Sequence, residues 1–265
     1  MEESATVKRR RRAPYTQPAY YDVAFSSNRD GEVSFLMHCF TAYAKRSVRQ
    51  VVDIACGPGA HALRLAQRGY RITAFDLSPE NTRYVAEKAY RQGLDITVNI
   101  DDMAKFQLSE KVDAAICLQN SQGYMLTNDD LVRHFRAVAA ALRRGGLYIF
   151  DRYMVSSWTN PARSWSWSRR RGRLIVRASF SALHDVNPVT QLFRERMTLE
   201  AVENGTRRVY RQTYISRMVF PQELRALVEL AGGFEFVQWF FGFKPHQVLE
   251  RSKHPLLMVV VLRRT

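Results

Sequence analysis

A short apolar run that ends in a glycine-rich turn constrains the fold of this chain more than any other feature. Residues 51–55 read Val-Val-Asp-Ile-Ala, and Cys56, Gly57, Pro58 and Gly59 lead from them into a helix-forming segment. This pattern is typical of a buried strand beside a nucleotide site in a parallel sheet. The glycines allow a ligand to approach the backbone closely, and the start of the helix offers free amides.

From this turn to about residue 150, strand-like and helix-like segments alternate. Strands are expected over residues 51–55, 71–75, 96–100, 112–118 and 147–150, and helices over residues 60–68, 79–91 and 129–142. The glycines agree with these boundaries, because Gly69 follows the first helix and the pair Gly145 and Gly146 separates the third helix from its strand. Such alternation predicts an α/β fold with a doubly wound parallel sheet.

The chain changes character after residue 151. Short strands are expected over residues 174–180, 191–199 and 208–219, and Asn204-Gly205 is a strong signal for a hairpin turn. Residues 152–220 are therefore predicted to form an antiparallel β insertion. A helix over 221–231 and strands over 234–241 and 256–262 follow it. Upstream, an apolar helix over 32–45 is expected to pack beside the first strand, and the N-terminal part is expected to cover the site as a lid.

Positive charge is concentrated in two parts of the chain. The net charge is +15, of which residues 1–12 contribute +3 and residues 152–220 contribute +9. The polar start, with five consecutive basic residues over 8–12, predicts a disordered basic tail over residues 1–14, followed by a single domain over 15–265. The basic surface is either a solvated face or a site for anionic ligands; contact with nucleic acid is possible but not favoured.

The cysteines and the apolar runs indicate the cellular compartment expected for the chain. Cys39, Cys56 and Cys117 have no C-x-x-C spacing and fall in expected helix, turn and strand. We therefore expect reduced thiols, no metal site and an intracellular protein. The longest apolar run, residues 256–262, is far shorter than the roughly 20 residues that span a bilayer. A cytoplasmic chain with no membrane partner is expected, and no oligomeric state is indicated.

Acidic residues follow the second and third predicted strands. Asp76 ends the second strand, where a carboxylate accepts hydrogen bonds from both ribose hydroxyls of an adenosine cofactor. Asp101 and Asp102 follow the third strand, where an acidic side chain accepts from an adenine amine. The turn by itself also satisfies the G-x-G-x-x-A fingerprint of a nicotinamide-dependent dehydrogenase, so both cofactor classes remain open at this point.

Together these segments resemble the class I S-adenosylmethionine-dependent methyltransferases over about residues 20–262. The matching segments are 51–59, 75–79, 101–103 and 145–151, in the family's order. The resemblance implies S-adenosylmethionine as the cofactor and a Rossmann-like sheet with an antiparallel last strand, an ending that a dehydrogenase would not share. The implied cofactor-binding residues are Tyr20, Asp53, Ala55, Cys56, Gly57, Gly59, Asp76, Leu77, Asp102, Met103 and Gln119.

The resemblance also gives several of these residues separate roles. Asp53 would order the loop and the amino end of the cofactor, and Asp76 would hold the ribose. Asp102 and the amide of Met103 would hold the adenine. Gln119, just past the fourth predicted strand, would contact the methionine part near the sulfonium.

The loop after the fourth predicted strand bears on the methyl acceptor. Residues 118–124 contain no Pro-Pro, unlike members of the family that methylate DNA bases or protein glutamine. The stretch over 120–124 is similar to small-molecule N-methyltransferases, including those acting on amino sugars and glycine-like amines. We therefore expect in-line transfer of a methyl group to a small-molecule acceptor, most simply an amine, with Tyr21 and Tyr124 as candidate catalytic residues.

Several alternatives stay open. A hydroxyl acceptor would need a base, for which His184 and His246 are candidates. An RNA or protein methyltransferase would use the basic patch, whereas a non-catalytic relative would bind the cofactor as a scaffold. The tryptophan- and arginine-rich stretch 165–171 would cover the acceptor pocket, and its arginines would suit an anionic acceptor.

Overall fold

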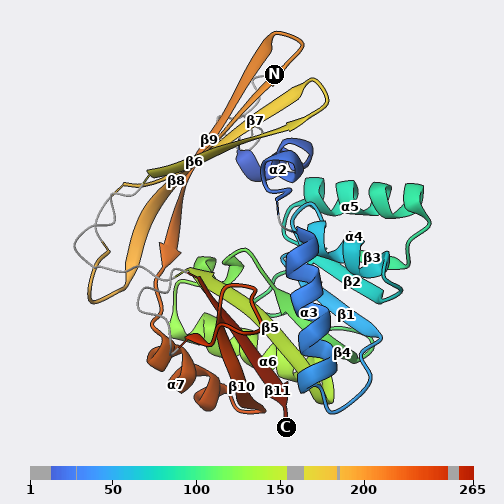
Figure 1. The fold of residues 1–265 in the computed structure, drawn as a ribbon. Coiled ribbons are helices and arrows are strands. Elements are labelled where there is room, and N and C mark those ends of the chain that lie inside the picture. Colours follow the sequence, from blue (N-terminus) through green and yellow to red (C-terminus); the bar gives the residue numbers. More distant parts are fainter. Residues whose placement is uncertain (1–12, 28, 154–163, 184–185, 250–256) are drawn as a thin grey trace, which may run out of the picture.

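The chain folds into two sheets with helices around and between them (Figure 1). The computed structural model describes residues 13–27, 29–153, 164–183, 186–249 and 257–265. One sheet has seven strands in the order β10-β11-β5-β4-β1-β2-β3, and the other has four in the order β6-β7-β8-β9. The expected basic tail, Trp158 and His184 lie outside the described residues, apart from the tail's last two positions.

The seven-stranded sheet has the predicted doubly wound form. Its strands are β1 (Gln50–Ile54), β2 (Arg71–Asp76), β3 (Ile96–Ile100), β4 (Val112–Cys117), β5 (Leu142–Tyr153), β10 (Phe234–Phe241) and β11 (Leu257–Arg264). β11 pairs antiparallel with both β5 and β10, whereas the pairs among β1 to β5 are parallel. The central strands are buried on both faces, which explains why they read as continuous apolar runs rather than alternating ones.

Helices cover both faces of this sheet. They are α3 (Arg29–Tyr43), α4 (Ala60–Ala66), α5 (Pro79–Gln92), α6 (Asn128–Ala141) and α7 (Pro221–Ala231). The hydroxyl of Ser78 accepts a hydrogen bond from the amide of Asn81 and so caps α5, which ends at Gly93 with φ of 62°. Thr127 caps α6 in the same way, by accepting from the amide of Asp130.

Gly145 and Gly146 do not separate a helix from a strand, contrary to the expectation from the sequence. α6 ends at Ala141 and β5 already begins at Leu142. The register between β4 and β5 shifts here, so the pair lies in an irregular part of the strand. A Cβ on Gly146 would stand 2.5 Å from the carbonyl oxygen of Asp113, which makes the glycine a requirement of close strand packing.

The four-stranded sheet is the predicted antiparallel insertion, with one strand more than expected. Its strands are β6 (Ser164–Arg171), β7 (Leu174–Ala182), β8 (Leu192–Glu203) and β9 (Thr206–Arg217). The predicted hairpin turn joins β8 to β9, with positive φ angles at Asn204 and Gly205. β6 was missed because its run of serine, tryptophan and arginine lacks the aliphatic residues that mark a strand.

A short N-terminal helix lies between this second sheet and the rest of the molecule (Figure 1). α2 (Pro18–Ala24) packs Val23 and Ala24 into a separate small core with apolar residues of β7 and β8. The buried carboxylate of Asp22 accepts from Tyr84 Oη at 3.0 Å and pairs with Lys88 and Arg171. Burial raises the pKa of Asp22, but the hydrogen bonds and charges of Arg171 and Lys88 outweigh this and lower it.

The packed part of the chain begins before residue 15. Ala13 and Pro14 are buried, and Pro14 starts the 3-10 helix η1 (Pro14–Thr16), whereas the sequence places the end of the tail at residue 14. The three cysteines are free and buried, as expected. No helix within the described ranges has the length and apolar character needed to cross a bilayer.

Candidate active site

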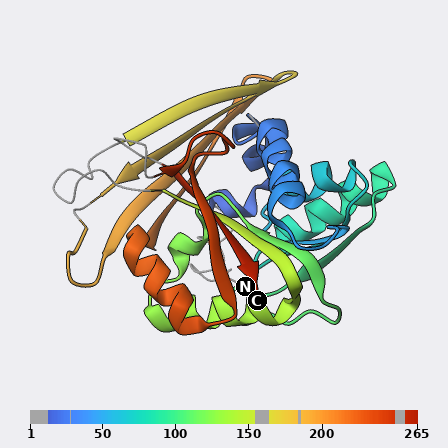
Figure 2. The ribbon, with the colours of Figure 1, turned by 60° about the horizontal axis from the view of Figure 1, so that its bottom comes forward.

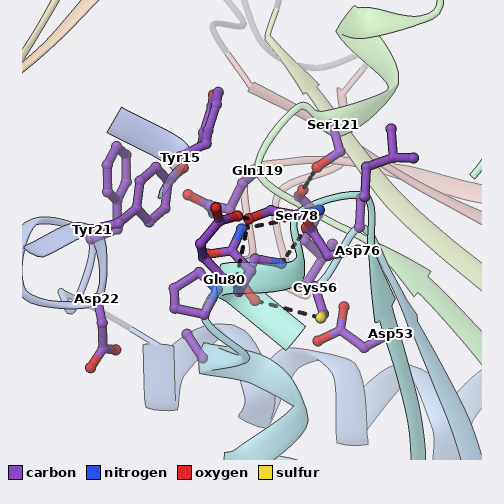
Figure 3. Close-up of a pocket in the computed structure, with 18 of the residues that line it drawn as sticks. Tyr15, Tyr21, Asp22, Asp53, Cys56, Asp76, Ser78, Glu80, Gln119 and Ser121 are labelled. Atoms are coloured by element: carbon purple, nitrogen blue, oxygen red, sulfur yellow. Dashed lines mark hydrogen bonds between the residues drawn. The ribbon is translucent and has the colours of Figure 1, made fainter. Parts of the chain in front are cut away.

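A cavity of about 410 Å³ opens at the carboxyl ends of the parallel strands (Figure 3). One side is formed by the loops that follow β1 to β4, and the other by η1, α2, β9 and the 3-10 helix η2 (Ser121–Tyr124). The cavity therefore lies where open α/β sheets bind their ligands, between the two sheets of this chain. We call its two sides the strand-end wall and the tyrosine wall.

The turn after β1 brings backbone to the cavity. Ala55 and Gly57 have φ angles of 55° and 52°, a left-handed conformation that favours glycine, and both residues line the cavity together with Cys56 and Pro58. No atom lies within 4 Å of where a Cβ on Gly57 would stand. Gly59 does not line the cavity: a Cβ there would stand 2.7 Å from Val85, so this glycine serves the packing of α5.

Asp53 is a buried carboxylate at the bottom of the strand-end wall. Its Oδ2 accepts a hydrogen bond from the amide of Ala62 at 3.1 Å, which ties β1 to the start of α4. Burial raises the pKa of Asp53 to about 7, against the lowering effect of this hydrogen bond. A positively charged group beside Asp53 would therefore be strongly favoured, because it restores the ionised carboxylate.

Asp76 is fixed by the turns on either side of it. Its Oδ2 accepts from the amide of Gly57 at 2.9 Å, and its Oδ1 accepts from the amide of Ser78 at 2.9 Å. Asn81 Nδ2 adds a longer contact of 3.3 Å. Asp76 and its neighbour Leu77 both line the cavity, so the carboxylate holds the glycine turn in place and faces the ligand space at once.

The loop after β3 differs from the expectation by one residue. Asp101 and Met103 line the cavity, but Asp102 does not. Asp102 Oδ1 instead accepts from the amide of Ala104 at 2.9 Å and so stabilises its own turn, while Asp101 Oδ1 accepts from the amide of Asp102. The two adjacent side chains of this loop face different sides, which sequence spacing could not resolve for this Asp-Asp pair.

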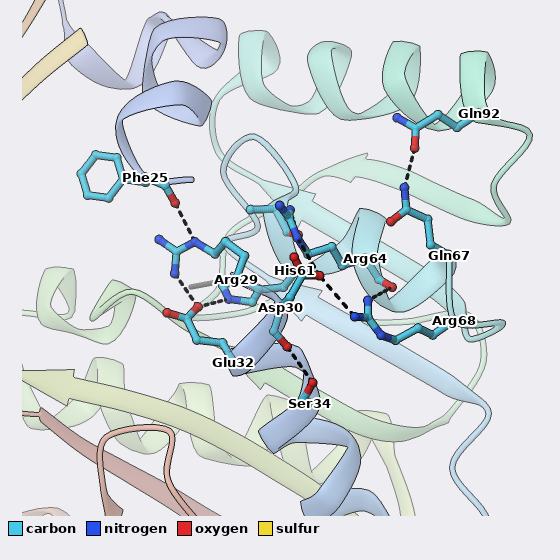
Figure 4. Close-up of polar contacts among 11 residues, drawn as sticks. Phe25, Arg29, Asp30, Glu32, Ser34, His61, Arg64, Gln67, Arg68 and Gln92 are labelled. Carbon is cyan, nitrogen blue, oxygen red and sulfur yellow. Dashed lines mark hydrogen bonds and ion pairs between the residues drawn. The ribbon is translucent and has the colours of Figure 1, made fainter. Parts of the chain in front are cut away.

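A buried network that the sequence did not reveal supports the strand-end wall (Figure 4). Arg29, at the start of α3, lines the cavity and donates to Gln119 Oε1 at 2.8 Å and to the carbonyl of Phe25 at 2.7 Å. Glu32 forms an ion pair with Arg29 and contacts His61 Nε2 at 2.6 Å. No local motif marks these residues, because the contacts join α3, α4 and the loop after β4.

The protonation states within this network follow from its burial. Burial lowers the pKa of His61, so His61 is neutral and donates to Glu32. Burial raises the pKa of Glu32, but His61 and Arg29 outweigh this and keep it below its usual range. The guanidinium of Arg29 is thus held at the cavity by an ionised partner, and it positions the side chain of Gln119.

The tyrosine wall gathers aromatic residues from four separate elements. It consists of Tyr15 of η1, Tyr21 of α2, Tyr124 of η2 and Tyr214 of β9. The hydroxyls of Tyr15 and Tyr124 share a hydrogen bond of 2.5 Å, and the ring of Tyr21 stacks on Phe25 with centroids 4.1 Å apart. Burial raises the pKa of Tyr15, Tyr21, Tyr124 and Tyr214, so these phenols are neutral near physiological pH.

Three expectations about this side of the cavity are not met. Tyr20 does not line the cavity; it lies against Tyr210 of β9 with ring centroids 5.7 Å apart, because neighbouring residues on a helix face different sides. His246 is exposed and outside the cavity. No arginine of the 165–171 stretch lines the cavity, and Trp167 instead donates to the carbonyl of Ala24.

Comparison with known proteins shows what one part of the chain resembles. Residues 51–146 match the family model described as a methyltransferase domain. A dTDP-4-amino-2,3,4,6-tetradeoxy-D-glucose N,N-dimethyltransferase from Saccharopolyspora spinosa is 32% identical over 103 residues, covering 39% of this chain and 40% of that protein. A glycine/sarcosine N-methyltransferase from Aphanothece halophytica is 27% identical over 109 residues, covering 40% and 41%. The chain thus spans less than half the length of these two curated relatives.

Structural comparison extends the likeness to nearly the whole chain. The crystal structure of an S-adenosylmethionine-dependent methyltransferase from Clostridium acetobutylicum ATCC 824 matches with a TM-score of 0.76 at 17% identity, covering 92% of this chain and 96% of that chain. At this identity the match shows a shared fold. Residues 51–146 are therefore similar to methyltransferase domains, and the chain has the fold of the S-adenosylmethionine-dependent methyltransferases.

The residues present at the cavity fit S-adenosylmethionine. Asp53 offers a carboxylate whose charge a ligand ammonium would stabilise, and Gly57 leaves open space at the turn. Asp76 and Met103 line the cavity further along the strand ends, where a ribose and an adenine would follow. Among the described residues, no group of His, Cys, Asp or Glu side chains has the arrangement of a metal site.

Proposed function

We propose that this chain transfers a methyl group from S-adenosylmethionine to an amine nitrogen of a small molecule. The observation that carries the proposal is the division of one cavity into a strand-end wall of backbone and carboxylates and a tyrosine wall of neutral phenols. The first suits the amino and ribose groups of the cofactor. The second suits an uncharged amine held for attack.

The strand-end wall would bind the cofactor through groups already held in place. Asp53 takes the ammonium of the methionine part, and Asp76 takes the ribose hydroxyls while keeping its bond to the amide of Gly57. Met103 and Asp101, rather than Asp102, meet the adenine. S-adenosylmethionine supplies an electrophilic methyl group on a sulfonium, so positioning of the acceptor accounts for most of the remaining catalysis.

The tyrosine wall would orient the acceptor without removing a proton before transfer. The hydroxyls of Tyr15 and Tyr124 form one hydrogen-bonded pair, so a lone pair on Tyr124 can accept from an acceptor N–H and aim the nitrogen lone pair at the methyl group. Because their pKa values are raised by burial, neither phenol acts as a base near neutral pH. The faces of Tyr21 and Phe25 exclude water from this region.

The lining favours an acceptor that brings no negative charge. Arg29 is the single arginine or lysine among the described residues that line the cavity, and Glu32 already neutralises it. An amino sugar fits this wall better than an amino acid does, because hydroxyls of a sugar pair with phenols whereas a free carboxylate would meet no spare cation. The sugar N,N-dimethyltransferase relative supports the same choice over the glycine/sarcosine N-methyltransferase relative.

The proposal is tested by methyl transfer from labelled S-adenosylmethionine to paired acceptors. An amino sugar without a phosphate group is compared with the same sugar carrying a hydroxyl in place of the amine, and with glycine. We expect label in the amino sugar alone. Label in the hydroxyl sugar, or in glycine at an equal rate, would contradict the proposed acceptor. A failure to bind S-adenosylmethionine would contradict the proposed reaction.

A further inference from the structure

Six exposed arginines of the second sheet are separated from the cavity by the sheet itself, whereas Arg171 and Arg208 lie on its inner face. Side chains along a strand alternate between faces, and the cross-strand register assigns each residue to one of them. The inner face carries Val176, Ala178 and Leu199 against α2, and Tyr214 toward the cavity. The outer face points away from α2 and from the seven-stranded sheet (Figure 2).

The outer face is rich in arginine and hydroxyl side chains. Its exposed arginines are Arg170, Arg177, Arg194, Arg196, Arg207 and Arg211. Its single carboxylate among the described residues of these strands is that of Glu200, which Arg207 already binds through two hydrogen bonds. The hydroxyl residues between the arginines are Ser164, Ser166, Ser168, Ser179, Ser181, Thr198 and Thr213.

The arginines of this face outnumber its acidic residues, so the face carries a net positive charge. In one cross-strand row Ser166, Ser179, Thr198 and Arg211 lie side by side, and the next row holds Ser164, Ser181, Arg196 and Thr213. Arg177 and Arg211 donate only to the hydroxyls of Ser166 and Thr198. Within the described part of the chain, Arg170, Arg194, Arg196 and Arg211 have no acidic partner, whereas Arg177 lies opposite Glu200, which Arg207 also binds.

The composition of the face distinguishes between possible partners. Protein interfaces depend on buried aromatic, methionine or large apolar anchors, and single-stranded nucleic acid stacks its bases on aromatic rings. The outer face of the described strands has no aromatic residue and no methionine. Its apolar members are Leu192, Val209, Ile215 and the cross-strand pair of Ile175 and Val202. Arginine with serine and threonine is the set that contacts phosphate oxygens of a duplex without reading its sequence.

We propose that the outer face of the β6–β9 sheet, the arginine–hydroxyl face, binds the phosphodiester backbone of duplex nucleic acid. This site is separate from the cavity and does not depend on the proposed methyl transfer. Each arginine that neutralises one phosphate contributes about 0.9 to the slope of the logarithm of the binding constant against the logarithm of salt concentration. Binding is therefore expected to be independent of sequence and to weaken steeply with salt.

The test measures fluorescence anisotropy of a labelled DNA duplex with the full-length chain across a salt series. The variant R177T/R196T/R211T replaces three central arginines by a residue that suits a strand. The matched control, R83Q/R91Q/R144Q, removes three exposed arginines that lie elsewhere. We expect the first variant to lower the salt slope by about 3 and the control to leave it within about 1 of the original chain. The single variant R196T is expected to lower it by about 1.

Three results would overturn the proposal. One is equal loss of duplex binding in both triple variants, and another is no change in the outer-face variant. The third is displacement of the duplex by poly-glutamate as effectively as by unlabelled duplex at equal charge concentration, which would assign the face to an acidic polypeptide instead. Calorimetry with S-adenosylmethionine is expected to give the same affinity for all three variants, since none of the replaced residues lines the cavity.

Discussion

The two walls of the cavity are built in different ways from the same chain. The strand-end wall comes from loops that directly follow β1, β2, β3 and β4, and its polar groups are held by backbone amides, as in Asp53 with Ala62 and Asp76 with Gly57. The tyrosine wall joins residues as far apart as Tyr15 and Tyr214 through ring contacts. One wall is specified by local motifs, the other by tertiary packing.

This difference separates what is shared within the fold from what is particular to the chain. Loops at the ends of parallel strands meet at the same edge whatever the second sheet does, so the cofactor side can be kept while the acceptor side changes. Substitutions in the strand-end wall should therefore change cofactor binding, and substitutions in the tyrosine wall should change use of the acceptor. The predictions below test that separation.

The largest effect is expected for Asp53→Asn. Burial raises the pKa of Asp53 to about 7 in the fold, so its contribution to stability is present below about pH 4 and is lost as the pH rises through about 7. The asparagine side chain of the variant is uncharged at every pH, so its burial does not depend on pH. We expect thermal melts of the free variant to match the original chain near pH 4 and to show greater stability as the pH rises, by as much as about 4 kcal/mol near pH 8.

The same substitution is expected to weaken binding of S-adenosylmethionine, because the ligand ammonium loses its carboxylate partner. A variant that is more stable and yet binds less cofactor would identify Asp53 as a residue kept for function. Equal stability of the two chains near pH 8, or unchanged cofactor affinity, would remove Asp53 from the proposed role.

Asp76→Ala is expected to have the next largest effect. It removes the proposed ribose acceptor and the support of Gly57, which should cost about 1 to 3 kcal/mol of cofactor binding measured by calorimetry. Asp95→Ala is the matched control. Asp95 is exposed and forms a salt bridge with Arg71, which lies at the opposite end of β2 from Asp76. A KM for the acceptor that rises as much as the cofactor dissociation constant would contradict the separation of the walls.

Tyr124→Phe is expected to have a smaller effect, and to change use of the acceptor rather than binding of the cofactor. It removes one hydroxyl and leaves the ring packed, so kcat/KM for the acceptor should fall by roughly fivefold, or about 1 kcal/mol. The affinity for S-adenosylmethionine should not change. Steady-state kinetics with calorimetry on the same preparation distinguishes this from a general loss of structure, which would weaken both.

Tyr20→Phe should have the smallest effect. Tyr20 lies against Tyr210 and accepts a long hydrogen bond from Arg208, outside the cavity. We expect cofactor affinity and turnover to stay within about 0.5 kcal/mol of the original chain. A loss similar to that of Tyr124→Phe would show that Tyr20 reaches the ligand after all.

The strand-end wall and the first sheet were largely predictable from the sequence. Alternating periodicity and the glycine turn located most of the strands and helices within a few residues, because these signals are local. Errors arose where neighbours in sequence separate in space, as at Asp101 and Asp102 and at Tyr20 and Tyr21. Arg29, Tyr15 and Tyr214 were missed because only tertiary contacts bring them to the cavity.

The central claim is that the glycine turn of residues 51–59 forms one side of an S-adenosylmethionine site and not of a dinucleotide site. Calorimetric titration of the unmodified chain with S-adenosylmethionine and, separately, with NADH tests it most directly. We expect saturable binding of S-adenosylmethionine at one site per chain and no heat of binding with NADH. Binding of NADH, or of neither compound, would contradict the account.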